Sequence, residues 1–208
     1  MRFADLGFSS NQSHSVLEGR TSMKSTILLA VFAPVALAAA ALLGAEHEHA
    51  EHAHAAAAPK TAIAVLIPTE GNSVQGVLHM KMVGESLEIT GQVKGLKPGE
   101  HGFHIHEFGD LSAADGTSAG GHFNPSGHDH GGPDSADHHA GDLGNITADD
   151  KGIATVNKVS KGLTIPMIVG RTFVVHAGVD DLKSQPSGDS GPRVAVGVIG
   201  YAKPLAEK

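Results

Sequence analysis

The chain has 208 residues, which is enough for one domain with a sizeable hydrophobic core and a tail. Its 27 glycines, few aromatic residues and lack of tryptophan favour a turn-rich β protein over a helical bundle. A formal net charge of -7 without a basic run argues against nucleic-acid binding, and the absence of cysteine excludes disulfides, cysteine nucleophiles, thiolate zinc sites and iron–sulfur clusters.

Residues 23–45, MKSTILLAVFAPVALAAAALLGA, have the order of parts typical of a secretory signal peptide. Lys24 supplies the positive start, an apolar stretch follows, and an alanine run offers small residues for cleavage. We therefore expect an exported protein, periplasmic or extracellular, with no stable membrane span after cleavage. The alternative is a membrane anchor, but residues 27–43 are marginally short for one and a proline interrupts them. Residues 1–22 place charged and polar residues ahead of this pattern, which favours a mis-called upstream start with Met23 as the true first residue.

Residues 46–60 read EHEHAEHAHAAAAPK and form a low-complexity, His-rich linker. Its histidines alternate with acidic residues and alanines; they are His47, His49, His52 and His54. Such tracts bind metal loosely and without a preformed geometry, so an auxiliary metal-gathering role and a plain solvated linker both stay open. The chain has 15 histidines against 7 phenylalanines, and histidine is the commonest metal ligand among side chains.

From Thr61 onward the apolar residues recur with period two, which predicts half-buried β-strands. The expected strands cover residues 62–67, 77–82, 87–93, 102–107, 144–147, 153–159, 172–176 and 194–201. About eight short strands with turns between them indicate an antiparallel sandwich or barrel. Two irregular segments, residues 111–141 and 177–192, are long for connections in a compact β domain, and such loops are usually functional or disordered.

The segment GFHIHEFGD alternates apolar and imidazole side chains along one expected strand. If Phe103 and Ile105 point into the core, then His104 and His106 project from the opposite face and lie close enough to share one ion. In residues 172–176 the same alternation leaves His176 on the outer face.

The loop that follows carries further candidate ligands. Three imidazoles and one carboxylate make a set suited to tetrahedral zinc: His122, His130, His139 and Asp142. His128 and His138 are neighbours and rival candidates, whereas His79 and His101 fit ordinary polar positions in or beside strands.

Six stretches of the chain resemble copper–zinc superoxide dismutases: GFHIHEFGD, SAGGHFNP, HGGP, GDLGNITAD, GRTFVVH and RVAVGVIG. They occur in the family's order within residues 61–208, which we expect to be the dismutase domain. The resemblance implies an eight-stranded antiparallel Greek-key β-barrel or sandwich, immunoglobulin-like, with two long functional loops.

The resemblance also implies the site residues. The copper ligands fall on His104, His106, His122 and His176, and the zinc ligands on His122, His130, His139 and Asp142. His122 would bridge the two metals. Asp180 matches the carboxylate that links a copper histidine to a zinc histidine, and Arg193 matches the arginine that guides the anion to copper.

The implied activity converts superoxide to dioxygen and hydrogen peroxide by alternate reduction and oxidation of copper. Zinc cannot change oxidation state, so copper would do the redox work. The resemblance implies that His122 would take up a proton when copper releases it, and that Arg193 would offer a permanent positive charge to the anion.

One departure from the family is that Val196 stands where its loop disulfide normally has a cysteine, and residues 111–121 contain none. A disulfide contributes about 2–4 kcal/mol, so we expect metals and packing to hold the loop instead. Segment 177–192 also looks shorter than in eukaryotic relatives, and a homodimer is one possible assembly.

Two other functions compete with the enzyme. An exported copper-buffering or copper-delivery protein would use the His-rich tail as its main active part, and would need neither an anion guide nor a second metal. A structural module that has lost its metals should lack at least one ligand. All the matching ligands are present, together with Arg193, which favours the dismutase.

Overall fold

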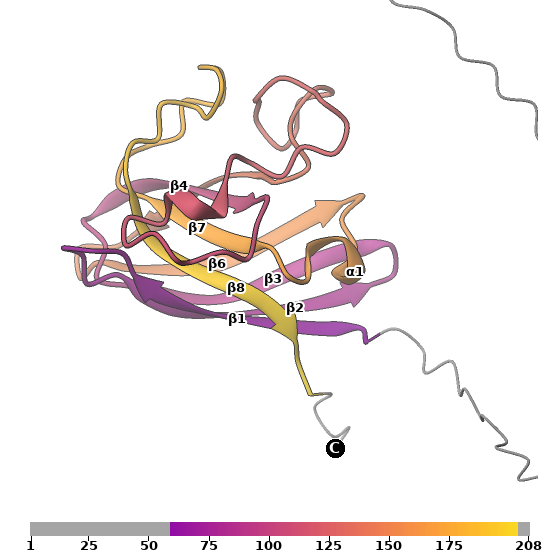
Figure 1. Cartoon of the computed structure of the whole chain (residues 1–208), viewed down its shortest axis with the longest axis horizontal. Helices are drawn as coiled ribbons and strands as arrows, with labels where there is room; N and C mark the ends of the chain where they lie inside the picture. Colours follow the sequence, from indigo (N-terminus) through magenta and orange to yellow (C-terminus); the bar gives the residue numbers. More distant parts are fainter. Residues whose placement is uncertain (1–58, 204–208) are drawn as a thin grey trace, which may run out of the picture. The chain divides into compact units, whose positions relative to one another are not determined.

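The computed structural model describes residues 59–203, and in this range eight strands close into one antiparallel barrel (Figure 1). The strands are β1 (Thr61–Pro68), β2 (Gln75–Val83), β3 (Ser86–Lys94), β4 (Gly99–His106), β5 (Asp142–Ala148), β6 (Ile153–Lys161), β7 (Thr172–His176) and β8 (Arg193–Tyr201). Their order around the barrel is β1-β2-β3-β6-β5-β4-β7-β8. The connections from β3 to β4 and from β6 to β7 skip neighbours, as in a Greek key. The predicted all-β, eight-stranded antiparallel fold is confirmed, and the barrel is closed.

Each expected strand is present, and the two differences that bear on the site lie at the starts of β4 and β5. β4 begins three residues earlier than expected because Gly99 and Glu100 pair with the end of β5. β5 begins at Asp142 because that residue pairs with His104. In both cases backbone pairing with a neighbour extends a strand beyond its apolar pattern.

The core of the barrel fixes which face of β4 carries the imidazoles. Phe103 and Ile105 are fully buried in the hydrophobic core, as is Phe173 of β7. The rings of Phe103 and Phe173 stack with their centroids 5.1 Å apart and an interplanar angle of 6°. Because side chains alternate along a strand, His104 and His106 must leave the barrel on its outer face.

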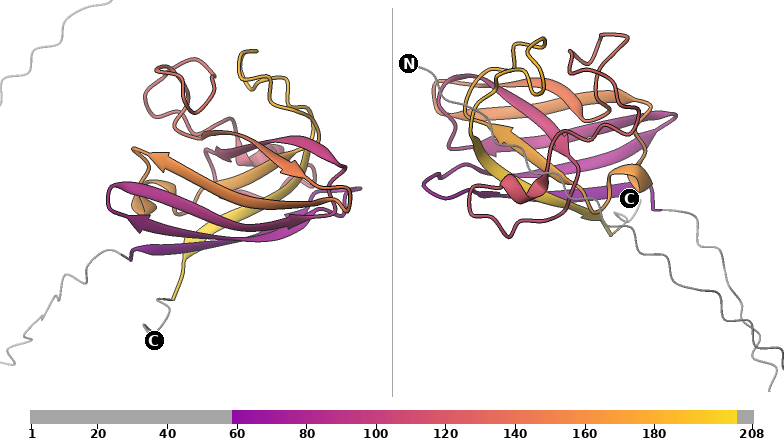
Figure 2. Two further views of the ribbon diagram at one scale, coloured as in Figure 1. Left: turned by 180° about the vertical axis from the view of Figure 1, so that it is seen from behind. Right: turned by 45° about the horizontal axis from the view of Figure 1, so that its top comes forward.

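The two long segments lie where the sequence predicted irregular structure. Residues 107–141 connect β4 to β5 and contain the short 3-10 helix η1 (Thr117–Ala119), and residues 177–192 connect β7 to β8. Both views in Figure 2 show these loops extending from the same side of the barrel. They touch each other, since the backbone N–H of His130 donates to the side chain of Gln185 over 2.8 Å.

The loop after β4 is anchored without a covalent bridge. Gly116 lies over Val196, and a Cβ atom at Gly116 would come within 2.8 Å of a Val196 methyl group. The backbone N–H of Glu70 donates to Ala114 O over 2.8 Å, and that of Phe108 donates to Ala119 O over 2.9 Å. Close packing and backbone hydrogen bonds therefore tie this half of the loop to the barrel.

Between β6 and β7 the chain forms one helical turn that the sequence did not predict, α1 (Ile165–Ile168). A proline sits in its first turn, where its missing N–H costs nothing. Among residues 59–203 no helix has the length and hydrophobicity needed to cross a membrane. The expected upstream segment, signal peptide and linker histidines (His47, His49, His52 and His54) lie outside the described residues.

Candidate metal centre

Two groups of four ligand atoms converge on the outer face of β4. The four-histidine site consists of His104, His106, His122 and His176. The mixed site consists of His122, His130, His139 and Asp142. Within each site the ligand atoms all lie within 4.8 Å of one another, and every one of these residues is buried. These are the two ligand sets that the sequence resemblance implied, with His122 in both.

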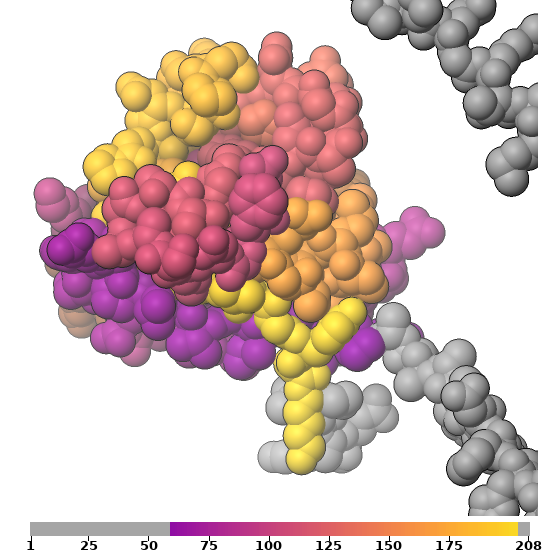
Figure 3. Space-filling model, in the orientation of Figure 1, coloured from indigo at the N-terminus to yellow at the C-terminus, as the bar shows by residue number. Residues whose placement is uncertain are grey.

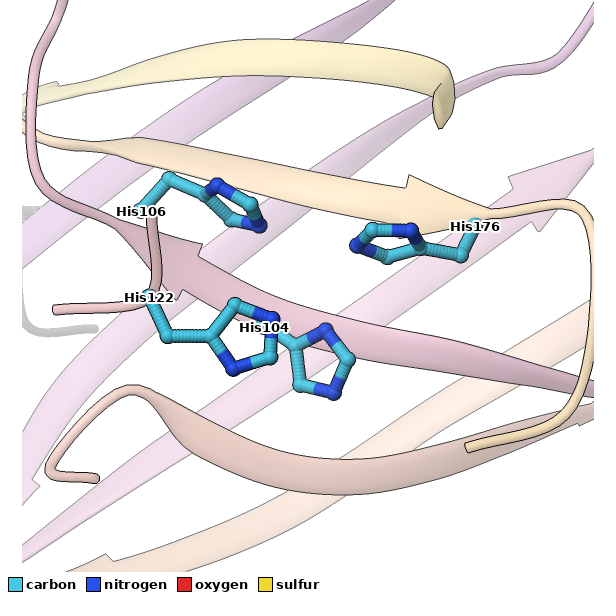
Figure 4. A group of neighbouring side chains, drawn as sticks. All are labelled: His104, His106, His122 and His176. Carbon is cyan, nitrogen blue, oxygen red and sulfur yellow. The ribbon is translucent and has the colours of Figure 1, made fainter. Parts of the chain in front are cut away.

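The four-histidine site is built on two adjacent strands and one returning loop (Figure 4). β4 contributes His104 and His106, and β7, which pairs with β4, contributes His176. His122 reaches the site because its backbone forms an isolated antiparallel bridge with His106. Strand pairing and this single bridge therefore hold all four imidazoles at one place.

In each ring of the four-histidine site one nitrogen is buried without a hydrogen-bond partner: Nδ1 of His104 and Nε2 of His106, His122 and His176. The opposite nitrogens are occupied: Nδ1 of His106 donates to Gly120 O and Nδ1 of His176 donates to Gly191 O, both over 2.9 Å. These carbonyls accept only, so each ring keeps a free lone pair on the nitrogen that faces the site. Buried polar atoms without partners are costly, and four such lone pairs at one point fit a metal ion.

The mixed site has the spacing of a tetrahedral ligand set. His139 Nδ1 lies 3.2 Å from Asp142 Oδ1 and 3.4 Å from His122 Nδ1. His130 Nδ1 lies 3.1 Å from Asp142 Oδ2, and His122 Nδ1 lies 2.7 Å from Asp142 Oδ1. Zinc–nitrogen distances of about 2.0–2.1 Å place tetrahedral ligands about 3.3 Å apart. Three of these separations are close to that value, and the 2.7 Å pair is a hydrogen bond between His122 and Asp142. Three nitrogens and one carboxylate gathered in this way suit zinc.

One ring belongs to both sites. Nδ1 of His122 faces Asp142 and His139, whereas its Nε2 lies among the orphaned nitrogens of the four-histidine site. The ring is thus positioned to contact two ions at once through its two nitrogens.

Asp180 joins the two sites from behind. Its carboxylate accepts from His104 Nε2 over 2.7 Å and from His130 Nε2 over 2.9 Å. The backbone of Asp180 is held in turn by the side-chain amide of Asn145. A carboxylate in this position fixes the tautomer and direction of one ring from each site.

Burial favours the neutral form of the three imidazoles that β4 and β7 contribute. Burial lowers the pKa of His104 and His106 well below the usual value of 6.5, and the neighbouring His122 lowers both further. Burial also lowers the pKa of His176 to about 4. Burial alone would raise the pKa of Asp142, but hydrogen bonds from the His122 ring and from backbone amides hold it well below 3.8. Near neutral pH the lone pairs of His104, His106 and His176 are therefore free for a metal ion.

An open pocket of about 470 Å³ leads to the four-histidine site, and Arg193 lines it together with His106, His122 and His176. The guanidinium of Arg193 donates to the carbonyls of Gly116 and Gly120, so the anchored loop after β4 holds it in place. Burial lowers the pKa of Arg193, but an arginine starts so far above neutrality that it stays cationic.

The remaining histidines of the domain lie outside both sites. His79 and His128 are exposed, and His138 Nδ1 lies 2.7 Å from the carbonyl of His139. His101 is buried, with its two ring nitrogens 2.8 Å from the carbonyls of His176 and Lys97. No sequence pattern pointed to the carbonyls of Gly120 and Gly191, because any residue type provides a backbone carbonyl.

The fold and the paired ligand sets define a β-barrel protein with two adjacent groups of side chains that could each hold a metal ion. A family model described as "Copper/zinc superoxide dismutase (SODC)" matches residues 74–199, which is more than half of the chain. The chain therefore belongs to the copper/zinc superoxide dismutase family.

Two relatives illustrate the similarity. The copper chaperone for superoxide dismutase of Rattus norvegicus is 43% identical over 143 residues, which is 65% of this chain and 52% of that protein. The chain thus spans about half the length of this curated relative. The crystal structure of the clock protein EA4 superposes with a TM-score of 0.63 and 39% identity, covering 69% of this chain and 96% of that one.

Metal removal should loosen the two halves of the β4–β5 loop unequally. The N–H groups of Gly131 and His139 both donate to Asp142 Oδ2, so their protection depends on the mixed site. The N–H of Phe108 donates to a backbone carbonyl instead. Hydrogen exchange of metal-loaded and metal-free protein should show much faster exchange around residues 128–140 and little change around residues 108–121. Equal protection with and without metals would contradict this account.

The metal-free protein should also lose stability as the pH falls from about 6.5 to about 4. The His176 ring has a pKa of about 4 when folded against 6.5 for the free ring, so the unfolded chain binds more protons in this range and is favoured by acid. At about 1.4 kcal/mol per pH unit, His176 alone contributes about 3 kcal/mol. Urea unfolding of chelator-treated protein across this range measures the loss, and His176→Gln should reduce it. A free energy of unfolding that does not change with pH would rule the explanation out.

Proposed function

We propose that the protein is a superoxide dismutase, with copper held by the four-histidine site and zinc by the mixed site. The observation that carries the proposal is the His122 ring, whose two nitrogens face two different buried ligand sets. A site for one metal needs no shared ring. The sharing gives a redox ion and a redox-inert ion one common ligand.

Copper would supply the one-electron exchange that superoxide dismutation requires, and the protein would supply a binding place for the anion and a source of protons. Arg193 is the fixed cation in the pocket beside His106 and His176. His122 can hold a proton on Nε2 while Nδ1 stays directed at the mixed site. Zinc would order the loop that carries His130 and His139.

The net charge of -7 does not oppose an anionic substrate. Two divalent ions and Arg193 would dominate the field inside the pocket, whereas the acidic residues are dispersed over the chain. Superoxide dismutase is itself a standard example of an enzyme whose charges steer the substrate anion, and the same effect would apply here.

A second candidate function is copper handling, either buffering through the His-rich tail or delivery to another protein. The name of the rat relative supports this candidate. Against it, a delivery site must release its ion, and here the four candidate copper ligands are buried and come from two strands and one loop position. A donor also gains nothing from an arginine held in the pocket.

The test is superoxide decay catalysed by the full chain loaded with copper and zinc. His106→Ala should abolish catalysis because it removes one copper ligand. Arg193→Gln should lower the rate about tenfold or more and weaken its dependence on salt, because the guiding charge is gone. His79→Ala, which removes an exposed histidine of β2, should match the unmodified protein. Full activity in His106→Ala would defeat the copper assignment, and metal binding without any superoxide decay would favour copper handling.

We also propose that the protein forms a homodimer through the outer surface of β1 and β8. These neighbouring strands expose apolar side chains, with relative exposures of 57% for Val65, 48% for Ile67 and 37% for Val198. Phe108, 57% exposed, follows β4, and Figure 3 shows that segment on the same face as β1 and β8. Exposed apolar residues that gather on one face mark an interaction surface, and a second copy would complete it symmetrically.

Val65→Asp should convert such a dimer to monomer, because it buries a charge at the interface without a partner. Val159→Asp is the matched control, since Val159 is 61% exposed but lies on β6, three strands away around the barrel. Sedimentation equilibrium gives the mass of each variant. A monomeric unmodified protein, or a dimer that survives Val65→Asp, would exclude this surface.

A further inference from the structure

Three backbone segments that carry candidate ligands meet and form a closed set of hydrogen bonds. The N–H of Ile105 donates to Gly141 O over 2.9 Å, the N–H of Gly141 donates to Phe123 O over 2.9 Å, and the N–H of Phe123 donates to Ile105 O over 2.8 Å. Each residue donates to one partner and accepts from the other. We call this set the backbone junction.

The backbone junction lies next to most of the candidate ligands. Ile105 stands between two of them on β4, Phe123 directly follows the shared ring, and Gly141 directly precedes the carboxylate of the mixed site. The ligands within two residues of the junction are His104, His106, His122, His139 and Asp142. These are five of the seven ligand residues, and they include members of both sites.

Only glycine fits at position 141. A Cβ atom there would lie 2.2 Å from Ile105 O and 3.0 Å from Phe123 N, the two atoms that form one edge of the junction. A glycine is needed here because three backbone segments approach closely, and not because of the backbone conformation, since Gly141 does not have a positive φ. Any larger residue must therefore push the loop and β4 apart.

Arg171 packs against the ring of Phe123 and so holds this segment of the backbone junction in place. The guanidinium carbon of Arg171 lies 3.6 Å from the centroid of the Phe123 ring, and its Nη1 donates to Glu107 O over 2.7 Å. Its Nε donates to Met167 O over 2.8 Å, which fixes the arginine to α1. Arg171 thus joins the residues that follow His106 and His122.

We infer that Gly141 is a positioning residue that sets the distance between the strand-borne and loop-borne ligands, so that the His122 ring can serve both sites. The inference rests on the proposed two-metal site but not on turnover. Opening the junction by about 1 Å would exceed the tolerance of metal coordination, which is about 0.2 Å in ligand distance. The buried hydrogen bonds of the junction resist such opening, because breaking them leaves polar groups without partners in an apolar core.

The experiment compares the full chain with Gly141→Ala, each loaded with Cu(II) at the four-histidine site and Co(II) at the mixed site. Two paramagnetic ions that share one imidazole are magnetically coupled, and the coupling alters the Cu(II) electron paramagnetic resonance signal. We expect the unmodified protein to show coupling and Gly141→Ala to show an isolated Cu(II) signal. Zinc affinity, measured by competition with a chelator, should fall about 10–100-fold.

The matched control is Gly76→Ala on β2, where a Cβ atom would lie 2.4 Å from Gln92 O, a similar backbone collision away from all the ligands. It should lower thermal stability but keep the coupling and the zinc affinity, which separates positioning from general destabilisation. Arg171→Met gives a second test if Gly141→Ala does not fold, and it should weaken zinc binding in the same direction.

The possible outcomes separate the inference from the proposed function. Coupling and zinc affinity that persist in Gly141→Ala would overturn the inference. If that variant does not fold, unchanged zinc affinity in Arg171→Met would overturn it. An unmodified protein that binds both ions without coupling would instead overturn the proposed function, because the His122 ring would not be shared.

Discussion

The arrangement of this structure depends on four buried imidazole nitrogens that have no hydrogen-bond partner. Burial strips the nitrogens of His104, His106, His122 and His176 of water, and the protein offers them no hydrogen-bond donor. An arrangement of this kind is costly for a folded chain unless an ion completes it. The surrounding features serve to keep these lone pairs free and pointed at one another: the low pKa values, the carbonyls behind the rings and the Asp180 link.

The alternation along β4 connects this constraint to the fold. The same two-residue period that buries Phe103 and Ile105 in the barrel sends His104 and His106 to the outer face. The ligands are therefore as rigid as the core beneath them, since a shift of the strand would disturb both. The loop brings His122 against this strand through a single backbone bridge, and the junction at Gly141 braces it.

The β4–β5 loop combines two kinds of anchoring. Its first half is tied to the barrel by packing of Gly116 over Val196 and by backbone hydrogen bonds, where the family normally has a disulfide. Its second half depends on Asp142, which receives two backbone N–H groups as well as the imidazoles. Because the carbonyls of the first half hold Arg193, the charge in the pocket does not depend on a redox-sensitive bond.

The sequence by itself determined the eight strands, the two long loops and the residue types of both ligand sets. Period-two patterning is local, and the family resemblance assigned each histidine to a metal. Only the tertiary structure decided that the barrel closes, which nitrogen of each ring faces the site, and which carbonyls hold the others. It also decided the junction at Gly141 and the short helix α1. These features depend on contacts between distant residues, such as Arg193 and the carbonyl of Gly116, which are 77 positions apart. A local sequence pattern cannot predict such a contact. Backbone carbonyls are the same in every residue type, and a close approach of two backbone segments is visible in the sequence at most as a glycine.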